Sequence, residues 1–539
     1  MSNGKKFIAL ALLTFIVLIA VGVFANHHSG DPEGTKTGNR SDLVAEGVLK
    51  SKTVEPNAVG LQALADGLGH LGVGLNFTWL LVTGFLVLFM QVGFAFLVTG
   101  LTRAKNAGHM MMMNIAAFAV AFIAYYICGF AFQFGGVAPI IHLGGTGPLS
   151  SLFGHGSAGF IGLHGFFLQT GSTYDVGTIA FFLFQVVFME TAGYIIIGAI
   201  AERINFRTFL IAEVAMGALI YPIYGMWVWG GGWLAKLGVS AGLGHGAVDF
   251  AGSGVVHATG GWAALALAML LGPRIGKYKK DGTPRAFPGH NQGYVVIGTL
   301  ILVFGWMGFN PGSTFGAVDL RIAIVAVNTL ISACLGFVFA MAWTWSRWGK
   351  PDISMSCNGM LAGLVAITAP CAFVAPWAAA MIGTIAGILV CYSVEFIDRR
   401  LRIDDPCGAI SVHGVCGTWG VLAVGIFADG TYGAGWNGVP GHVTGFLYNW
   451  NFGQMGAQII DVIVGFAWAW GITWIIFSIV KSRRSLRVPA EAEIEGIDMP
   501  EFGALCYPDF VLQAETLGAD ESELETAGSS VGSDREVSQ

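Results

Sequence analysis

Two stretches of this sequence share one pattern: residues 249–261 read DFAGSGVVHATGG, and residues 405–417 read DPCGAISVHGVCG. In each stretch an aspartate precedes a histidine by eight positions, and a glycine follows that histidine by four positions. Both histidines, His257 and His413, lie inside long apolar segments, where polar side chains are costly and usually functional. The repeated motif indicates two structurally equivalent halves.

The segments around these motifs place the chain in a membrane. Hydrophobic residues make up 54% of the 539 residues and charged residues 11%, whereas soluble domains carry about 25% charged residues. Eleven apolar segments are long enough to span a bilayer, and they are continuous, which excludes a closed β-barrel and predicts an all-α membrane protein. The expected spans are 77–101, 109–134, 177–201, 207–234, 254–272, 291–314, 322–345, 354–374, 376–397, 409–428 and 455–480.

The two motifs fall in the fifth and the tenth of these spans, so the repeat has an odd number of helices and its halves must be inverted. We therefore expect two inverted five-helix repeats plus a final helix. Lysine and arginine support this count: eighteen lie in the loops after odd-numbered spans, whereas the intervening loops carry only Lys236 and Arg321. The positive-inside rule then predicts an N-terminus outside and a cytoplasmic C-terminus.

The ends of the chain differ from the spans. Lys5 and Lys6 precede an apolar run, Phe7–Ala25, which reads either as a cleaved signal peptide or as a retained helix. The predicted organisation is a signal peptide at 1–25, an extracytoplasmic segment at 26–76, a transmembrane domain at 77–481, a cytoplasmic C-terminal region at 482–514 and a disordered acidic tail at 515–539.

The paired histidines suit the passage of a small polar molecule. A neutral imidazole has one N–H donor and one acceptor, so two rings can line a narrow path. Adjacent rings resist double protonation, because like charges repel in a low dielectric. Such a path disfavours permanent cations and admits a small neutral molecule, and it could also pass a proton. The alternative for either histidine is a structural contact between helices.

The chain resembles the Amt/Mep/Rh ammonium transporter family, specifically its Amt branch, from about Asn76 to Phe510. The resemblance implies an eleven-helix bundle with a pore through each subunit of a homotrimer. The motifs that carry it are FMQVGF at 89–94, RAKNA at 103–107, AER at 201–203, DFAGSGVVH at 249–257, GWMGFNPGS at 305–313, and DPCGA at 405–409 leading to VHGV at 412–415.

The resemblance assigns pore roles to five residues. His257 and His413 would line the narrow pore, with Trp306 packed beside them. Phe188 and Phe309 would be gate rings above the histidines, with Phe309 the inner one. Plain packing is the alternative for Phe309.

It also implies an outer site for cation recruitment, formed by Trp229 and Ser313 with the buried carboxylate of Asp249 nearby. An aromatic face attracts a cation, a hydroxyl accepts from its N–H groups, and a carboxylate adds negative potential. Asp249 is also a good helix N-cap, and Trp229 also fits an interfacial aromatic belt.

Three positions depart from the family pattern. Ala192, four residues after Phe188, stands where an aromatic gate residue is common, so another ring must substitute or the cage has three sides. Glu190 lies close by in an apolar span, and we expect it to strengthen cation attraction at the mouth, a helix-end role being the alternative. Val98 replaces a glutamate that is common late in the first span.

The resulting expectation is an ammonium transporter that recruits the cation, deprotonates it and passes ammonia along the twin histidines. The alternatives are an ammonium sensor with little flux and a neutral NH3/CO2 gas channel. We expect no enzyme, cofactor, metal site or nucleic-acid partner. Motifs at 486–488, 496–498 and 507–510 resemble the family's cytoplasmic C-terminal region, which docks under neighbouring subunits, and the resemblance allows a PII-type signalling protein as a partner.

Overall fold

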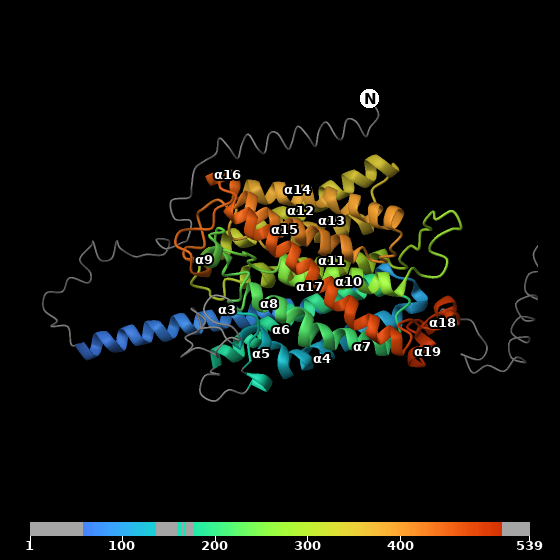
Figure 1. Cartoon of the computed structure of the whole chain (residues 1–539), viewed down its shortest axis with the longest axis horizontal. Helices are drawn as coiled ribbons and strands as arrows, with labels where there is room; N and C mark the ends of the chain where they lie inside the picture. Colours follow the sequence, from blue (N-terminus) through green and yellow to red (C-terminus); the bar gives the residue numbers. More distant parts are fainter. Residues whose placement is uncertain (1–57, 136–158, 164, 169–175, 509–539) are drawn as a thin grey trace, which may run out of the picture.

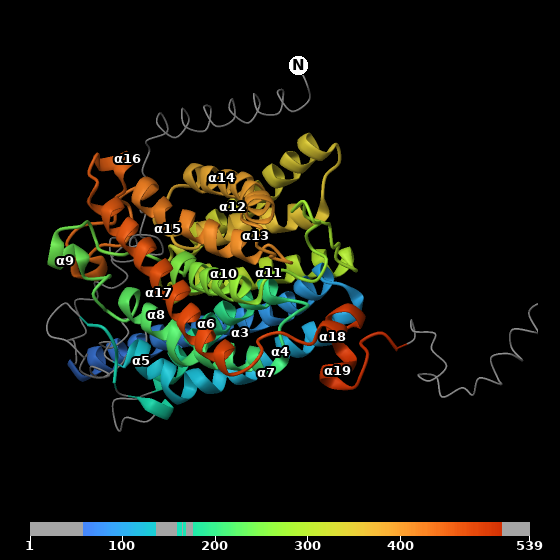
Figure 2. The same cartoon turned by 45° about the vertical axis from the view of Figure 1, so that its right-hand side comes forward.

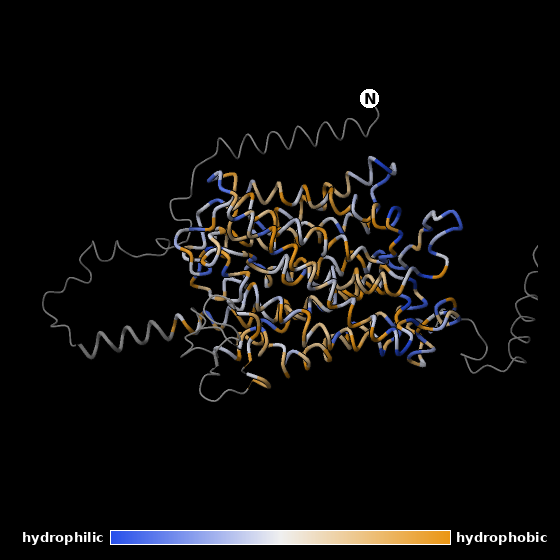
Figure 3. The backbone as a smooth tube through the Cα atoms, viewed as in Figure 1, coloured by the Kyte–Doolittle hydropathy of each residue, from blue (hydrophilic) through white to orange (hydrophobic). Residues whose placement is uncertain are grey.

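The computed structural model describes residues 58–135, 159–163, 165–168 and 176–508. The predicted leader at 1–25 and the predicted acidic tail at 515–539 lie outside the described residues. Within these ranges the chain is a bundle of helices whose axes are roughly aligned (Figure 1). Hydrophobic residues occupy the length of the bundle and hydrophilic residues gather at its two ends (Figure 3), as a membrane protein requires.

In the described part of the chain, ten helical segments are long and apolar enough to cross a membrane. Each falls on one of the eleven predicted segments. The long helices and their extensions are α3 (Ala58–Leu101), α4 (Ala107–Ala124) with η2 (Tyr125–Gly129) and α5 (Phe130–Phe134), α6 (Val176–Ile200), α7 (Phe206–Ala215) with η5 (Met216–Ile220) and α8 (Tyr221–Val228), η6 (Ser253–Ala258) with α10 (Thr259–Leu271), α11 (Gln292–Gly312), α12 (Ile322–Trp348), α14 (Pro376–Phe396) with η7 (Ile397–Leu401), η8 (Ile410–Val415) with α15 (Cys416–Phe427), and α17 (Gly453–Arg483).

The eighth predicted segment forms a shorter helix, α13 (Ile353–Ile367). The sequence predicted it to continue to residue 374, but the helix stops before Pro370, which lacks an N–H and disfavours helical backbone at the residue before it. The freed carbonyls are used elsewhere, because Thr368 and Ala369 accept from the backbone N–H groups of Ala251 and Phe250 at 3.1 Å each. The end of α13 is thereby tied to the chain just before η6.

Two other boundaries differ from the prediction. The helix of the first span does not begin at residue 77: α3 is continuous from Ala58, since no proline interrupts residues 58–101 and glycine alone does not end a helix. The fourth segment, predicted to reach residue 234, ends at Val228, because glycines 230–232 follow it. Trp229 therefore lies at the helix end rather than inside a span.

The packing of the helices is paired between the halves of the chain. The first predicted span, α3, packs along the sixth, α11. The second span, α4, packs against α6 and against α7, and in the other half α12 packs in the same way against α13 and α14. Figure 2 shows α12, α13 and α14 together on one side of the bundle and α4, α6 and α7 on the other.

The two histidine segments cross at the centre of this arrangement, and the glycines of the repeated motif make the crossing possible. A Cβ at Gly261 would overlap the backbone of Gly414, and a Cβ at Gly417 would overlap the backbone of Ser253. Each half therefore uses its motif glycine to admit the backbone of the other half.

Candidate functional site

The two motif histidines lie in contact inside the bundle. His257 in η6 and His413 in η8 are 0% and 5% exposed, and their Nδ1 atoms are 3.3 Å apart. The ring centroids are 5.3 Å apart. One Nδ1 donates a hydrogen bond to the other, so the pair shares a single proton between the rings. Within the described residues, Nε2 of His257 has no hydrogen-bond partner.

Aromatic rings extend the histidine pair in one direction. Phe188 of α6 and Phe309 of α11 are stacked with their centroids 3.9 Å apart, and Phe309 lies 5.4 Å from the His257 ring. Trp306, one turn before Phe309 on α11, stacks on His257 at 5.0 Å. The Trp306 indole N–H donates to the hydroxyl of Thr368 at 2.9 Å, which fixes its plane.

We name this set of rings the histidine column: Phe188, Phe309, Trp306, His257 and His413. Five predicted pore residues are thus brought together from four different spans.

The predicted outer residues adjoin the Phe188 end of the column. The Trp229 ring lies 6.2 Å from Phe188, and its indole N–H donates to the backbone carbonyl of Asp249 at 2.7 Å. The Ser313 hydroxyl donates to the carbonyl of Phe309 at 2.8 Å. These bonds occupy the donors of Trp229 and Ser313, and so the ring face and the hydroxyl oxygen are the groups left for a cation.

The Asp249 carboxylate holds the start of η6. It accepts four backbone N–H groups, from Gly252, Ser253, Gly254 and Val255, at 2.8–3.0 Å. Burial raises the pKa of Asp249 to about 6, although the four N–H donors favour its ionised form. The sequence left two roles open for Asp249, and these contacts are those of the N-cap.

Asp405 caps the corresponding helix in the other half of the chain. Its carboxylate accepts from the backbone N–H groups of Ala409 and Ile410 at 3.0 and 2.7 Å, at the start of η8. Burial also raises its pKa to about 6. The repeated motif is thus one structural device used twice, in which an aspartate caps a helix, a histidine projects from its first turns, and a glycine admits the other half.

The structure does not bring Glu190 to the ring of Phe188. Two residues along a helix rotate the side chain by roughly 200°, so Glu190 points to the opposite side of α6. There its Oε2 accepts from Gln91 Nε2 of α3 at 2.5 Å. The geometry therefore does not place the Glu190 side chain beside Trp229 and Ser313.

Another ring does substitute for the one missing at Ala192. Phe184 lies one turn before Phe188, and their centroids are 4.5 Å apart. It also packs edge-on against Phe315 at 5.6 Å. The position where the family pattern has a ring lies four residues after Phe188, whereas Phe184 lies four residues before it, a helical spacing that the sequence also shows.

Two further residues continue the column beyond His413. The Phe94 ring lies 6.4 Å from His413, and the Tyr194 ring stacks on Phe94 at 5.5 Å with an interplanar angle of 9°. Phe94 belongs to the FMQVGF motif, which was a signal that the sequence offered. Tyr194 had no such signal, because its partner comes from a distant span.

One end of the bundle carries a network of charges. Glu202 is bonded to Arg103 at 2.9 Å and to Arg274, which also holds Asp404 at 2.8 Å. Burial alone would raise the pKa of Glu202, but the two arginines lower it to about 2. The hydrogen bonds and charge of Arg274 likewise outweigh burial and hold the pKa of Asp404 well below its usual range.

The C-terminal region is docked on this charged end. Arg487 lies just before α18 (Ala490–Glu495) and binds Glu493 of that helix through two hydrogen bonds of 2.8 Å. Asp498, at the start of α19 (Asp498–Phe502), accepts from the backbone N–H groups of Gly108 and His109 at 2.8 and 2.7 Å. Figure 1 shows α18 and α19 together at this end.

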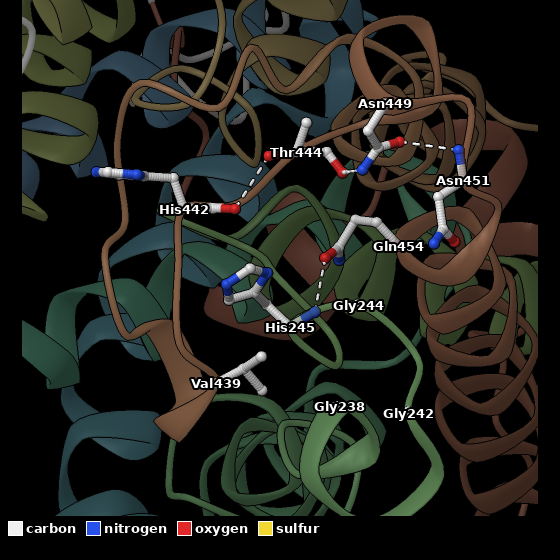
Figure 4. A pocket seen from close by; sticks show the side chains of 10 residues that line it. All are labelled: Gly238, Gly242, Gly244, His245, Val439, His442, Thr444, Asn449, Asn451 and Gln454. Atoms are coloured by element: carbon white, nitrogen blue, oxygen red, sulfur yellow. Dashed lines mark hydrogen bonds between the residues drawn. The ribbon is translucent and has the colours of Figure 1, made fainter.

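A polar pocket of about 300 Å³ lies at the other end, beside α9 (Leu237–Ala241) and α16 (Phe446–Asn449) (Figure 4). Gln454 lines the pocket, and its Oε1 accepts a hydrogen bond from the backbone N–H of His245 at 2.9 Å. In Figure 4 the His442 ring points away from the other labelled side chains. The pocket and the histidine column share no residue.

Comparison with known proteins assigns this geometry to a family. The model of the Ammonium Transporter Family matches residues 78–507, which is most of the chain. The chain belongs to the ammonium transporter family. It is 50% identical over 439 residues to the ammonium transporter Amt2 of Archaeoglobus fulgidus, covering 81% of this chain and 89% of that protein. It is 35% identical to Amt1 of Haloferax mediterranei, covering 81% and 80% of the two chains.

Solved structures of family members have the same fold. A protein described as a sensor Amt protein matches with a TM-score of 0.70 and 35% identity, covering 80% of this chain and 99% of that chain. Mep2 of Candida albicans matches with a TM-score of 0.64 and 27% identity, covering 76% and 84%. The family is one of transporters and not of enzymes, and the chain is a multi-pass membrane protein.

Proposed function

We propose that this ammonium transporter recruits the ammonium ion at Trp229 and Ser313, deprotonates it near Phe188 and Phe309, and passes ammonia along His257 and His413. The released proton crosses separately, by relay through the hydrogen-bonded histidine pair, so that net positive charge is moved. The observation that carries the proposal is the contact between the two imidazoles, closed at one side by stacked phenyl rings. The rings would part to admit a molecule of the size of ammonia.

The energetics favour the neutral molecule inside the column. Moving a bare monovalent cation from water into hydrocarbon costs on the order of tens of kcal/mol. The column offers aromatic faces and two imidazoles joined by a hydrogen bond, and the unpartnered Nε2 of His257 accepts from an N–H group in the tautomer whose proton lies on Nδ1 of His257. Such a lining supports ammonia and opposes a permanent cation.

We assign Asp249 a positioning role in this mechanism. Its two oxygens already accept four backbone N–H groups, so the carboxylate supplies negative potential beside Trp229 and fixes the helix that carries His257. Phe184 is the added ring beside Phe188.

We further propose the topology that the sequence predicted: eleven spans in two inverted repeats of five plus a final helix, with α13 as the eighth span. The matched packing of α4 with α6 and α7, and of α12 with α13 and α14, supports the repeat. The basic residues at the end that holds α18 and α19 support a cytoplasmic C-terminus and an N-terminus outside. We also propose the predicted division of the chain: a cleaved signal peptide at 1–25, an extracytoplasmic segment at 26–76 and a transmembrane domain at 77–481.

The assembly and its regulation are proposed on the resemblance. It implies a homotrimer with one pore in each subunit, and a cytoplasmic region at 482–514 that couples the subunits. The docking of Asp498 on the start of α4 supports a regulatory role for this region. A PII-type protein is the partner that the resemblance suggests for this face.

An ammonium jump on proteoliposomes fixed to a solid-supported membrane tests the transport proposal. We expect a saturable inward current for the wild type and a loss of most of it for His257→Ala. Rapid internal alkalinisation without current would instead indicate conduction of neutral ammonia. Ammonium binding with neither signal would favour a sensor, the role that the description of one structural neighbour names for that protein.

A further inference from the structure

Two glutamates lie deep in the bundle and take no part in the mechanism above. Glu190 lies within α6, and Glu213 lies within α7. Their exposed fractions are 1% and 0%. Acidic side chains inside a membrane are expensive to maintain and usually functional.

The two carboxyl groups are neighbours. The Glu213 carboxyl group is seated directly against α6 at Gly193, where a Cβ would overlap Oε2 of Glu213. Gly193 lies one turn after Glu190 on the same face of the helix, and the two carboxyl groups interact electrostatically. Glycine at position 193 is therefore what allows the pair to approach.

The pair has more acceptors than its surroundings supply with donors. Gln91 Nε2 donates to Oε2 of Glu190. In the described part of the chain, Oε1 of Glu190 and both oxygens of Glu213 are buried without a hydrogen-bond partner. Buried carboxyl oxygens in folded proteins are nearly always hydrogen-bonded, which favours a donor on the carboxyl groups themselves.

In the described part of the chain, no basic side chain is among the groups that interact electrostatically with Glu190 or Glu213. On α6, Tyr194 is the titratable group that interacts with both glutamates, and α3 presents the neutral amide of Gln91. The helix α4 packs on both α6 and α7, and the ring of its His109 lies against Phe502. The helix α10 packs on α6, and the His257 ring of the adjoining η6 lies in the histidine column.

Two adjacent carboxylates in this setting cannot both be charged, because each would add repulsion to the penalty of burial. A proton is the donor that fits, since the Glu213 carboxyl group already abuts the backbone of α6 and a proton needs no added volume. A pair of close, buried carboxyl groups therefore keeps one member protonated to a higher pH than an isolated carboxyl group would.

We propose that Glu190 and Glu213 form an intramembrane proton-binding site that holds a proton at neutral pH and sets the packing of α6. Loss of the proton would drive Glu213 away from Gly193 and Glu190. Because Phe188 lies on α6 two residues before Glu190, this movement would displace its ring from Phe309 and reduce transport at alkaline pH. The proton site stands independently of the transport mechanism, whereas its effect on Phe188 rests on the proposed function.

Infrared spectroscopy tests the proton directly. Purified wild type, Glu190→Gln and Glu213→Gln are compared through the carbonyl stretch of protonated carboxylic acids, with Glu495→Gln as a matched control because Glu495 is exposed in the C-terminal region. At neutral pH we expect each buried variant to lose part of this band and the control to keep it. An equal band in all four proteins would overturn the proposal.

Ammonium-jump currents at a constant ammonium concentration and rising pH test the consequence. Glutamine is permanently neutral and mimics the protonated pair. We expect Glu190→Gln and Glu213→Gln to keep their current at an alkaline pH at which the wild type and Glu495→Gln have lost theirs severalfold. Identical pH profiles would contradict the link to Phe188. Absence of current in the wild type at every pH would count against the proposed transport, and the infrared result would still decide the proton site.

Discussion

At the scale of single residues, the buried carboxylates of this protein divide by their partners. Asp249 and Asp405 are held by backbone N–H groups, and Glu202 and Asp404 by arginines. Glu213 has neither kind of partner within the described residues. The sequence shows all of these as acids near or inside spans, and the distinction between structural and functional acids comes from their partners.

The capping aspartates give a first prediction. Asp249→Asn and Asp405→Asn should each lower the stability of the protein by about 1–3 kcal/mol, because an amide NH2 would face backbone N–H groups that lose their acceptor. Thermal unfolding in detergent measures the change. Asp281→Asn is the control, since that side chain lies in an exposed loop, and it should have no effect. Equal stability of all three variants would refute the capping role.

The Glu202 network gives a prediction about pH. Glu202→Gln should cost about 3–5 kcal/mol at neutral pH, because it leaves buried arginine charge without its partner. The folded pKa of about 2 lies below the ordinary value of 4.5, so the stabilisation is present above pH 4.5 and is lost as the pH falls toward 2. The difference in unfolding temperature between the wild type and Glu202→Gln should therefore become smaller as the pH falls from 4.5 toward 2.

Glu395→Gln is the matched comparison for that series. Glu395 pairs with Arg347, which is 55% exposed, and such a pair contributes roughly 0–1 kcal/mol. A Glu395→Gln protein that is destabilised as strongly as Glu202→Gln would show that burial is not the cause.

At the scale of elements, the crossing of η6–α10 with η8–α15 decides where the histidines meet. Spacing alone predicted two equivalent segments, because aspartate, histidine and glycine recur at the same intervals. It could not predict that each glycine contacts the backbone of the other half, since that contact depends on the fold of the whole chain.

The crossing glycines give a further prediction. Gly261→Ala and Gly417→Ala should each destabilise the protein by about 1–3 kcal/mol or more and reduce ammonium current, because the new methyl group forces the two histidine segments apart. Gly471→Ala in α17 is the control, since a Cβ at that position has nothing within 4 Å. Unfolding temperature and current should both follow this order, and normal current in Gly261→Ala and Gly417→Ala would argue against a tight crossing.

The boundaries of elements were harder to predict than their existence. Each of the eleven apolar segments predicted from residue 77 onward forms helix in the described part of the chain. The early end of α13 before Pro370 and the end of α8 at Val228 follow from proline and glycine, whose effects compete with long apolar runs. Among the site residues, Glu190 shows the limit most clearly: we expected it to attract cations at the mouth, and helical rotation turns its side chain away from Phe188 to the other side of α6, where Gln91 binds it.

At the scale of the whole molecule, the C-terminal region packs on the charged end of the bundle. Asp498 caps the start of α4, and Glu493 accepts from the backbone N–H of Ile275 at 2.6 Å while it binds Arg487. The Asp498 contacts join residues 389 and 390 positions apart in the chain, and the contact of Glu493 with Ile275 joins residues 218 positions apart. The sequence supplied the docking motifs through a resemblance, and the partner residues on the bundle came from the structure.

This docking gives a prediction at the same scale. Asp498→Asn should loosen the C-terminal region while the bundle stays folded, because it weakens two charge-assisted bonds at the surface of α4. Hydrogen exchange should rise in residues 490–507 and remain low in α6 and α11. Glu491→Gln, an exposed change in the same region, should leave exchange at the wild-type level. Unchanged exchange in Asp498→Asn would mean that other contacts hold the region.

The central claim is that ammonia passes along His257 and His413, and the most direct measurement is the ammonium-jump current of the two single variants and the double variant. We predict that His257→Ala and His413→Ala each lose most of the current or its selectivity for ammonium over potassium, while His442→Ala, an exposed histidine outside the column, matches the wild type. Wild-type current and selectivity in the double variant, with all proteins folded, would contradict passage along the histidine column.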